Sequence, residues 1–290
     1  MRTFRNAVTN GDFTVTGQLR LYQDTGRDDV IRQAECLAGA VHAVAVTDCP
    51  YGVLHMSGLA VAAMLMQQGI DPLLQFSARD RNRLALKSEL LGAAALGVTS
   101  LLLQRGERLP GELQPEMTQV FDTGAKKFLA AARQLGEFQS ARGEPELLLG
   151  TMATVFDPPP EWQPVELNAK LDAGARFVQT QICLDLDLLR RYMKILVTAQ
   201  VTWRCHVVVS VPVLNSAESA RWLYENLRGS VVPEAVVRRF ENAADPEAVG
   251  VDYCAETIRA LQEMPGIGGV NLSTTGDAAL IAAAVDRAAS

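Results

Sequence analysis

The 290-residue sequence has little of what several large classes of protein require. Its five cysteines form no C-x-x-C pair, and its three histidines, His42, His55 and His206, do not stand at metal-ligand spacing. Neither a disulfide framework nor a metal site is therefore expected. No apolar run approaches the roughly 20 residues that cross a bilayer, and the N-terminus carries no run of signal-peptide length. We expect a soluble, cytoplasmic protein.

Basic residues and the motifs of nucleophilic catalysis are also scarce. Lys and Arg number 27 against 33 Asp and Glu, which gives a formal net charge of −6. Nucleic-acid binding requires clustered Lys and Arg, and no such stripe occurs. Ser-His-Asp and Cys-His arrangements and the G-x-S-x-G elbow are missing. We therefore expect neither nucleic acid nor membrane as a partner, and a cofactor that supplies the chemistry. Assembly into a homo-oligomer stays open.

The sequence does contain a regular alternation of two kinds of segment. Nearly half of its residues are hydrophobic, which is enough for a sizeable core. Eight short apolar runs predict strands at residues 13–19, 41–47, 72–77, 99–104, 146–150, 175–181, 205–211 and 268–273. Apolar residues at three- and four-residue spacing predict helices at residues 28–39, 57–68, 82–96, 117–135, 165–173, 186–199, 217–226 and 253–263.

This alternation predicts the fold class. Most of the expected strands are nearly continuous apolar runs, as in parallel sheets that are covered on both faces. Eight strands that alternate with helices indicate a single (β/α)₈ barrel, a TIM barrel, over residues 1–290 as one domain. An open doubly wound sheet is the alternative, but the segment from Gly17 to Tyr22 lacks its G-x-G-x-x-G fingerprint. Two long connections, 105–116 and 226–252, are expected to carry function.

Polar residues at the C-terminal ends of the expected strands are the candidates for an active site, because the barrel interior is normally apolar. A Gln side chain offers a donor and an acceptor on one plane, and Arg binds phosphate or carboxylate in a fork. The set favours a polar heteroaromatic ligand over hydrolysis. Its members are Gln18, Arg20, Thr47, Asp48, Gln75, Ser77, Arg79, Asp80, Arg81, Asn82, Gln104, Arg105, Gly106, Glu107, Thr151, Gln179, Gln181 and Ser210.

Several candidates also have a purely structural interpretation. Asp80 or Asn82 is a suitable N-cap for the helix that follows it, and the Thr47-Asp48 pair is suitable as the N-cap of the next helix after strand 41–47. Lys170 is an ordinary surface charge unless a phosphate approaches it. Gly106 is suited to a turn after a buried strand. Gln181 ends a buried apolar strand, where an amide needs a partner, and this favours a ligand contact.

Five segments in order carry a family resemblance: V-T-D at 46–48, L-Q-F-S-A-R-D-R-N at 74–82, L-L-G-A-A-A-L-G at 90–97, R-G-E at 105–107 and K-L-D-A-G-A-R-F-V-Q-T-Q at 170–181. Together they resemble the methylenetetrahydrofolate reductase family from about Phe13 to Thr275. The resemblance implies a (β/α)₈ barrel that binds FAD and uses NADH or NADPH. It implies reduction of 5,10-methylenetetrahydrofolate, a small-molecule folate, to 5-methyltetrahydrofolate.

The resemblance also implies roles for particular residues. Arg105 and Lys170 would lie near the phosphates and ribose of the flavin, and Gln181 would contact the folate or the nicotinamide. The implied cofactor-binding residues are Thr47, Gln75, Arg79, Arg105, Gly106 and Lys170, and the implied catalytic residues are Gln18, Glu107 and Gln181.

Three departures from the family pattern shape the expected mechanism. Gln18 stands where members of the family place a Glu that delivers a proton for ring opening, and an amide cannot act as a general acid. Glu107 stands where the family usually has Asp, and we expect it to take over an acid or electrostatic role.

The third departure concerns flavin binding. The segment Gly269–Gly276 is more polar than expected, which leaves flavin binding open. The alternatives are flavin-free hydride transfer from NADH to the folate, and a non-catalytic folate-binding partner of a methyltransferase.

Overall fold

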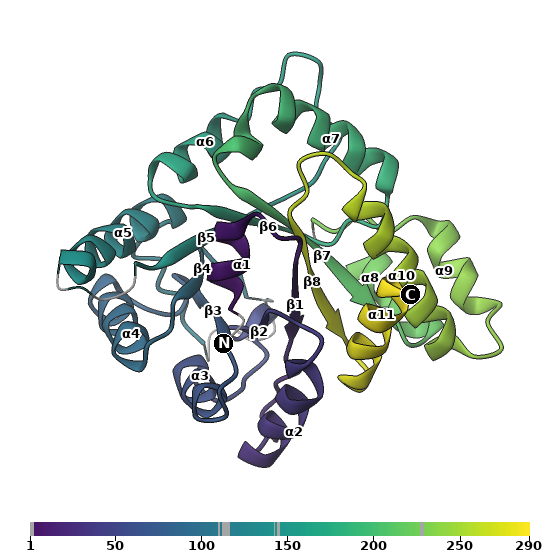
Figure 1. Cartoon of the computed structure of the whole chain (residues 1–290), viewed down its shortest axis with the longest axis horizontal. Coiled ribbons are helices and arrows are strands. Elements are labelled where there is room, and N and C mark those ends of the chain that lie inside the picture. Colours follow the sequence, from purple (N-terminus) through teal and green to yellow (C-terminus); the bar gives the residue numbers. More distant parts are fainter. Residues whose placement is uncertain (1–2, 110, 112–116, 142, 144–145, 227–228) are drawn as a thin grey trace.

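The computed structural model describes residues 3–109, 111, 117–141, 143, 146–226 and 229–290 (Figure 1). Eight parallel strands pair in sequence order, and β8 pairs with β1 to close a barrel. The predicted single (β/α)₈ barrel and its eight strands are confirmed. The strands are β1 (Thr14–Gln18), β2 (Ala43–Val46), β3 (Pro72–Ser77), β4 (Ser100–Gln104), β5 (Leu148–Ala153), β6 (Phe177–Thr180), β7 (His206–Val213) and β8 (Gly269–Thr274).

Helices form the outer layer of the barrel, except for the first helix, which lies over the barrel's centre (Figure 1). They are α1 (Phe4–Asn10), α2 (Arg27–Ala38), α3 (Gly58–Gln67), α4 (Arg83–Leu96), α5 (Ala125–Ala141), α6 (Val165–Asp172), α7 (Leu186–Thr198), α8 (Ala217–Asn226), α9 (Glu234–Glu241), α10 (Pro246–Gln262) and α11 (Ala279–Ala289). Short 3₁₀ turns lie at Pro50–Gly52 (η1) and Val201–Trp203 (η3). The sequence analysis did not predict α1, α9 or α11.

Local signals at the ends of α4 match the predicted helix. The Asn82 side chain accepts a hydrogen bond from the Ala85 N–H at 2.9 Å, so that Asn82 is the N-cap. Gly97 follows the last residue with φ +85°, the left-handed conformation of a glycine C-cap. The structural interpretation of Asn82 therefore holds.

The predicted helix over residues 117–135 is wrong at its start, because α5 begins at Ala125. The backbone N–H groups of Val120 and Phe121 donate to the carbonyl oxygen of Arg79, at 2.7 and 3.3 Å. Phe121 has φ +44°, which no helical residue adopts. These contacts hold residues 117–124 as a loop against the end of β3, and part of the predicted connection 105–116 lies outside the described residues.

The predicted long connection over residues 226–252 is also wrong, because it contains α9 and the start of α10. Val236, Val237 and Phe240 of α9 are buried, so packing fixes this segment. Asp245 accepts from the Ala248 N–H at 3.1 Å and Pro246 occupies the first helical turn, which is a strong start signal for α10. The predicted helix over 253–263 is only the second half of α10.

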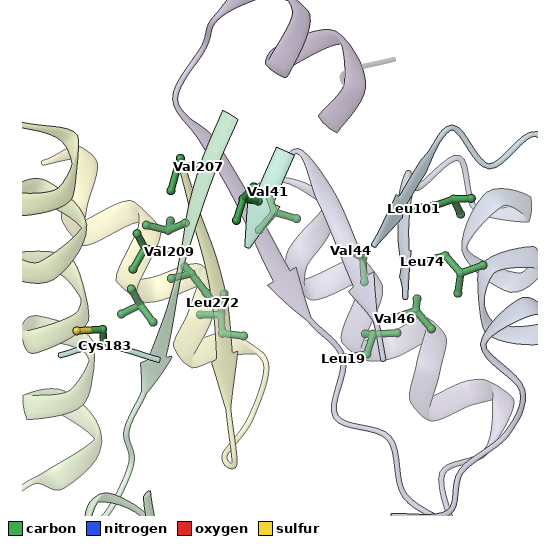
Figure 2. Close-up of a cluster of buried hydrophobic side chains, with 14 of the residues drawn as sticks. Leu19, Val41, Val44, Val46, Leu74, Leu101, Cys183, Val207, Val209 and Leu272 are labelled. Carbon is green, nitrogen blue, oxygen red and sulfur yellow. The ribbon is translucent and has the colours of Figure 1, made fainter. Parts of the chain in front are cut away.

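The core has two parts. The larger cluster fills the space between strands and helices, and Figure 2 shows part of it, including Val44 and Val46 of β2 and Leu272 of β8. The smaller cluster lies inside the barrel. There Phe4 of α1 is fully buried, with its ring centroid 5.1 Å from that of Phe177 at the start of β6. Helix α1 thus closes the N-terminal end of the barrel, and the C-terminal ends of the strands are left to form a site.

Candidate active site

A cavity of about 160 Å³ opens at the C-terminal ends of the strands. Amide side chains dominate its wall, which is unusual because barrel interiors are mostly filled by Val, Ile and Leu. They are Gln18, Gln75, Gln104, Gln179, Gln181 and Asn271. Of the nine residues that the sequence analysis assigned to the site, seven line this cavity: Gln18, Thr47, Gln75, Arg79, Gly106, Glu107 and Gln181. Their roles stay predictions.

Glu107 is a half-buried acidic residue in the wall of the central cavity. Burial raises its pKa above the ordinary Glu value. Hydrogen bonding to Tyr51, the positive charge of Arg79 and hydrogen bonding to Gln181 all lower the pKa, but together they do not offset burial. Glu107 thus keeps a proton to higher pH than an exposed Glu, as a general acid requires.

Tyr51 is a functional candidate that the sequence analysis missed. It interacts with Glu107, and burial raises the pKa of its hydroxyl, which keeps that group protonated. Cys49 and Tyr51 both have positive φ, at 45° and 55°, a strained conformation for residues other than glycine. The turn is held because Arg79 donates to the Cys49 carbonyl at 2.8 Å and the Cys49 N–H donates to His55 at 3.0 Å. The signal in the sequence is weak: Pro50 and Gly52 indicate only a turn.

Arg79 lies in the cavity wall but its guanidinium is already engaged. The side chain is 3% exposed, and it donates to Asp80 at 2.6 and 2.7 Å as well as to Cys49. These hydrogen bonds fix the position of the guanidinium, and its positive charge acts on the nearby carboxyl group of Glu107. Arg79 therefore contributes a positive charge to the wall of the cavity, whether or not it also contacts a cofactor.

Asp48 connects strand ends and does not cap a helix. Its carboxylate accepts from the Ser77 N–H at 2.7 Å and from both terminal nitrogens of Arg81, at 2.6 and 2.9 Å. The structural interpretation of Thr47-Asp48 as an N-cap is therefore wrong. The ion pair fixes the ends of β2 and β3, from which Thr47 and Gln75 face the cavity.

Gly106 cannot be replaced by a larger residue without a rearrangement. It has φ +85°, and a Cβ atom built on it would lie 2.0 Å from Ser77 Oγ. The glycine allows the chain to leave β4 and turn sharply over β3. This turn brings Glu107 to the cavity.

Arg105 and Lys170, the other two predicted residues, lie in a neighbouring cavity of about 510 Å³. The Arg105 guanidinium lies 4.5 Å from the ring centroid of Phe121, and Lys170 Nζ donates to the Met152 carbonyl at 3.0 Å. Burial lowers the pKa of Lys170. Lys126 and Lys127, in the first turn of α5, also line this cavity.

A third hollow of about 500 Å³ extends from the central cavity toward α8. It shares Gln18, Thr47 and Tyr51 with the central cavity, so the two adjoin. Its outer wall is apolar, with Leu21 and Leu214 buried and Trp222 half exposed. It can hold the flat, less polar portion of a ligand whose head lies in the central cavity.

Among the residues that the structure describes, no group of three His, Cys, Asp or Glu side chains is arranged to hold a metal ion. In the same part of the chain no helix combines the length and apolar character needed to span a bilayer.

The barrel and the amide-lined cavity at its C-terminal end define a (β/α)₈ protein with a site for a polar ligand. The family model for methylenetetrahydrofolate reductase matches residues 25–289, nearly the whole chain. The chain therefore belongs to the methylenetetrahydrofolate reductase family, the class of oxidoreductases that act on folate.

Among the comparisons with individual proteins, the similarity to 2,3-dimethylmalate lyase supports the fold alone. No curated protein matches the chain. A crystal structure of 2,3-dimethylmalate lyase, a member of the PEP mutase/isocitrate lyase superfamily, is similar with a TM-score of 0.51 and 11% identity, over 92% of this chain and 77% of that one. A structure of tryptophan synthase from M. tuberculosis gives a TM-score of 0.45 and 15% identity, over 96% and 95% of the two chains.

Proposed function

We propose that this protein reduces 5,10-methylenetetrahydrofolate to 5-methyltetrahydrofolate, with NADH or NADPH as the source of the hydride. Membership of the family supports the reaction class. The observation that carries the proposal for this chain is the half-buried carboxyl group of Glu107, with its raised pKa, in an amide-lined cavity. Amides suit the pterin ring, which carries donors and acceptors along one planar edge.

The reaction needs one proton as well as one hydride. The hydride adds to the methylene carbon, and the proton goes to the ring nitrogen whose bond to that carbon breaks. Gln18 cannot supply a proton, whereas Glu107 lines the same cavity and has a raised pKa. Glu107 is therefore the proposed general acid. After it has given up its proton, Tyr51 and Gln181 stabilise the resulting carboxylate by hydrogen bonding.

FAD is the cofactor that the family implies, and the chain offers a suitable set of donors. Arg105 and Lys170, with two lysines in the first turn of α5, fit the pyrophosphate of a dinucleotide, because both the cations and the helix dipole favour an anion there. Thr47 and Gln75 would then face the isoalloxazine ring. When bound, FAD would pass the hydride from the nicotinamide to the folate.

Flavin-free transfer is a second candidate, and the polar end of β8 favours it. Asn271 and Ser273, from the segment Gly269–Gly276 that departs from the family pattern, line the central cavity where the flavin ring would lie. The dinucleotide donors around Arg105 and Lys170 serve NADH as well as FAD. In that case the nicotinamide would lie directly next to the pterin, with no flavin ring between the two.

One set of measurements on the purified protein separates these candidates. A flavin absorbance band that persists through purification supports the FAD form. A colourless protein that oxidises NADH with methylenetetrahydrofolate, at a rate independent of added FAD, supports direct transfer. Binding of the folate with no turnover under either condition would indicate the non-catalytic partner and would refute the proposed reaction.

A further inference from the structure

The floor of the central cavity holds an amide that is only half satisfied. Gln179 of β6 is 4% exposed, and its Nε2 donates to Ser210 Oγ at 3.2 Å. Ser210 Oγ in turn donates to the Thr180 carbonyl at 2.6 Å. Because the one hydroxyl proton of Ser210 is used on Thr180, its oxygen can only accept from Gln179. The orientation of the Gln179 amide is thereby fixed, with Nε2 toward Ser210.

The carbonyl oxygen of the same amide has no donor. Within the described residues, Gln179 Oε1 is buried and has no hydrogen-bond partner. Two other buried atoms share this property, Ser100 Oγ and Thr151 Oγ1, but neither residue lines the cavity. A buried acceptor without a partner costs free energy, and native proteins seldom keep one without a reason. A donor supplied by a ligand would remove that cost.

The depth of Gln179 limits what kind of ligand can reach it. It lies two residues before Gln181, which directly follows the end of β6, and so about 6–7 Å further down the barrel. Its neighbours there are polar too: Ser210 of β7 pairs in register with Asn271 of β8, and Asn271 Oδ1 accepts from Thr16 at 2.8 Å. A planar ring that enters from the C-terminal ends of the strands can therefore present a polar edge to Gln179.

We propose that Gln179 Oε1 accepts a hydrogen bond from an N–H group on the leading edge of a planar heterocycle, and thereby selects that ring. The identity of the ring rests on the proposed function, which offers two sources of the same chemistry. One is the amino-pyrimidinone edge of the pterin, and the other is the carboxamide of the nicotinamide. Gln179 is thus a specificity residue deeper in the barrel than the Glu107 and Gln181 contacts.

Binding measurements test the proposal without requiring catalysis. Gln179→Leu keeps the bulk of the side chain and removes the acceptor. Calorimetric titrations of the full chain with tetrahydrofolate, NADH, NADPH and free pterin give the affinities. We expect one ligand class to bind about 3- to 10-fold more weakly, the usual effect of one neutral hydrogen bond. Loss confined to tetrahydrofolate and pterin identifies the pterin as the source, and loss confined to NADH and NADPH identifies the nicotinamide.

A stability measurement separates this role from a structural one. Gln179→Leu removes the hydrogen bond to Ser210 as well as the unpaired buried acceptor, and because the cost of the unpaired acceptor is at least as large as the gain from that bond, the thermal midpoint of the free variant should not fall. Ser210→Ala, which frees the amide to rotate, should weaken the same ligand class by a smaller factor. Gln262→Leu, at an exposed position of α10, is the matched control and should leave all affinities unchanged.

The outcomes for Gln179 and for the reductase activity are distinguishable. Unchanged affinities in Gln179→Leu, in a protein that turns over methylenetetrahydrofolate, overturn the role of Gln179 and leave the reaction standing. Weaker binding in the variant, in a protein that shows no turnover, supports the role of Gln179 and refutes the reaction. Failure of the wild-type protein to bind any of the four ligands overturns both.

Discussion

Arg81 donates two hydrogen bonds to the carboxylate of Asp48, at 2.6 and 2.9 Å, and so joins the end of β2 to the segment between β3 and α4. The Asp48 side chain is only 5% exposed and that of Arg81 20%. Because Thr47 and Gln75 lie next to these contacts and face the cavity, the ion pair holds one side of the site in place.

Neutralising Asp48 should therefore lower stability. We expect Asp48→Asn to reduce the free energy of unfolding by about 1.5–3 kcal/mol, because it weakens charge-assisted hydrogen bonds and leaves the largely buried guanidinium of Arg81 with only the more distant Glu89, at 3.5 Å, as an anionic partner. Urea denaturation measures the change. Asp187→Asn, which breaks an exposed pair with Arg190 on α7, is the control and should cost less than about 0.5 kcal/mol. Equal costs for the two variants would contradict the assigned role of Asp48.

Tyr51→Phe should change the pH dependence of turnover. Hydrogen bonding to Tyr51 lowers the pKa of Glu107, so its removal raises that pKa further. A general acid must be protonated, and activity therefore falls as the pH rises through the Glu107 pKa. We expect the alkaline limb of the kcat profile to move up by about half a pH unit to one unit in the variant. A limb that stays in place, or moves down, would separate Tyr51 from proton delivery.

Asp71, at the closed end of the barrel, should make stability depend on pH. Burial raises its pKa from 3.8 to about 6, while its Oδ2 accepts from the Phe4 N–H at 2.9 Å. The folded state thus binds the proton more tightly than the unfolded state, and stability falls as the pH rises from about 4 to about 6. An Asn side chain at position 71 can still accept the hydrogen bond from the Phe4 N–H, but it carries no charge.

We therefore expect Asp71→Asn to be more stable than the wild-type protein at pH 8, by about 2–3 kcal/mol, and equally stable near pH 3.5. His206, whose pKa burial lowers to about 4, titrates in an overlapping range with the opposite effect on stability. It contributes equally to both proteins, so the difference between their unfolding curves isolates Asp71. If the difference in unfolding free energy between the two proteins does not grow with pH, burial of the ionised Asp71 carboxylate does not destabilise the folded state.

Gly106→Ala should disturb both the fold and the site. The left-handed backbone and the clash of the added Cβ with Ser77 Oγ predict a loss of at least about 2 kcal/mol in unfolding free energy. Gly11→Ala is a matched control, since Gly11 has φ +77° but nothing within 4 Å of the added Cβ. It should cost only about 1 kcal/mol. Losses of the same size at both positions would mean that the contact with Ser77 is readily relieved.

Most of the barrel could be predicted from the sequence because its strands are short, fully buried and apolar, a pattern that depends on few other parts of the chain. The helices were harder where tertiary contacts override local pattern. Residues 117–124 have helical spacing of apolar residues, but hydrogen bonds to Arg79 hold them as a loop. Helix α9 has only eight residues, and its apolar face is evident only once it packs.

The site followed from one rule, that polar residues at strand ends face the same cavity, and this located Gln18, Gln75 and Gln181. The rule did not predict that Arg105 and Lys170 line a second cavity. The order of the strands does not determine how the loops beyond them are arranged. It also missed Tyr51, whose approach to Glu107 depends on two strained residues in a turn.

Turnover of methylenetetrahydrofolate by the wild-type protein and by Glu107→Gln is the most direct test that this barrel is a reductase with Glu107 as its acid. NADH or NADPH oxidation gives the rate, and mass spectrometry identifies 5-methyltetrahydrofolate. Glu263→Gln, at an exposed position after α10, is the control and should match the wild-type rate. We predict wild-type turnover and a loss of at least about 100-fold in Glu107→Gln. An active wild-type protein whose Glu107→Gln variant turns over equally fast would contradict the mechanism, and a wild-type protein that forms no product would contradict the function.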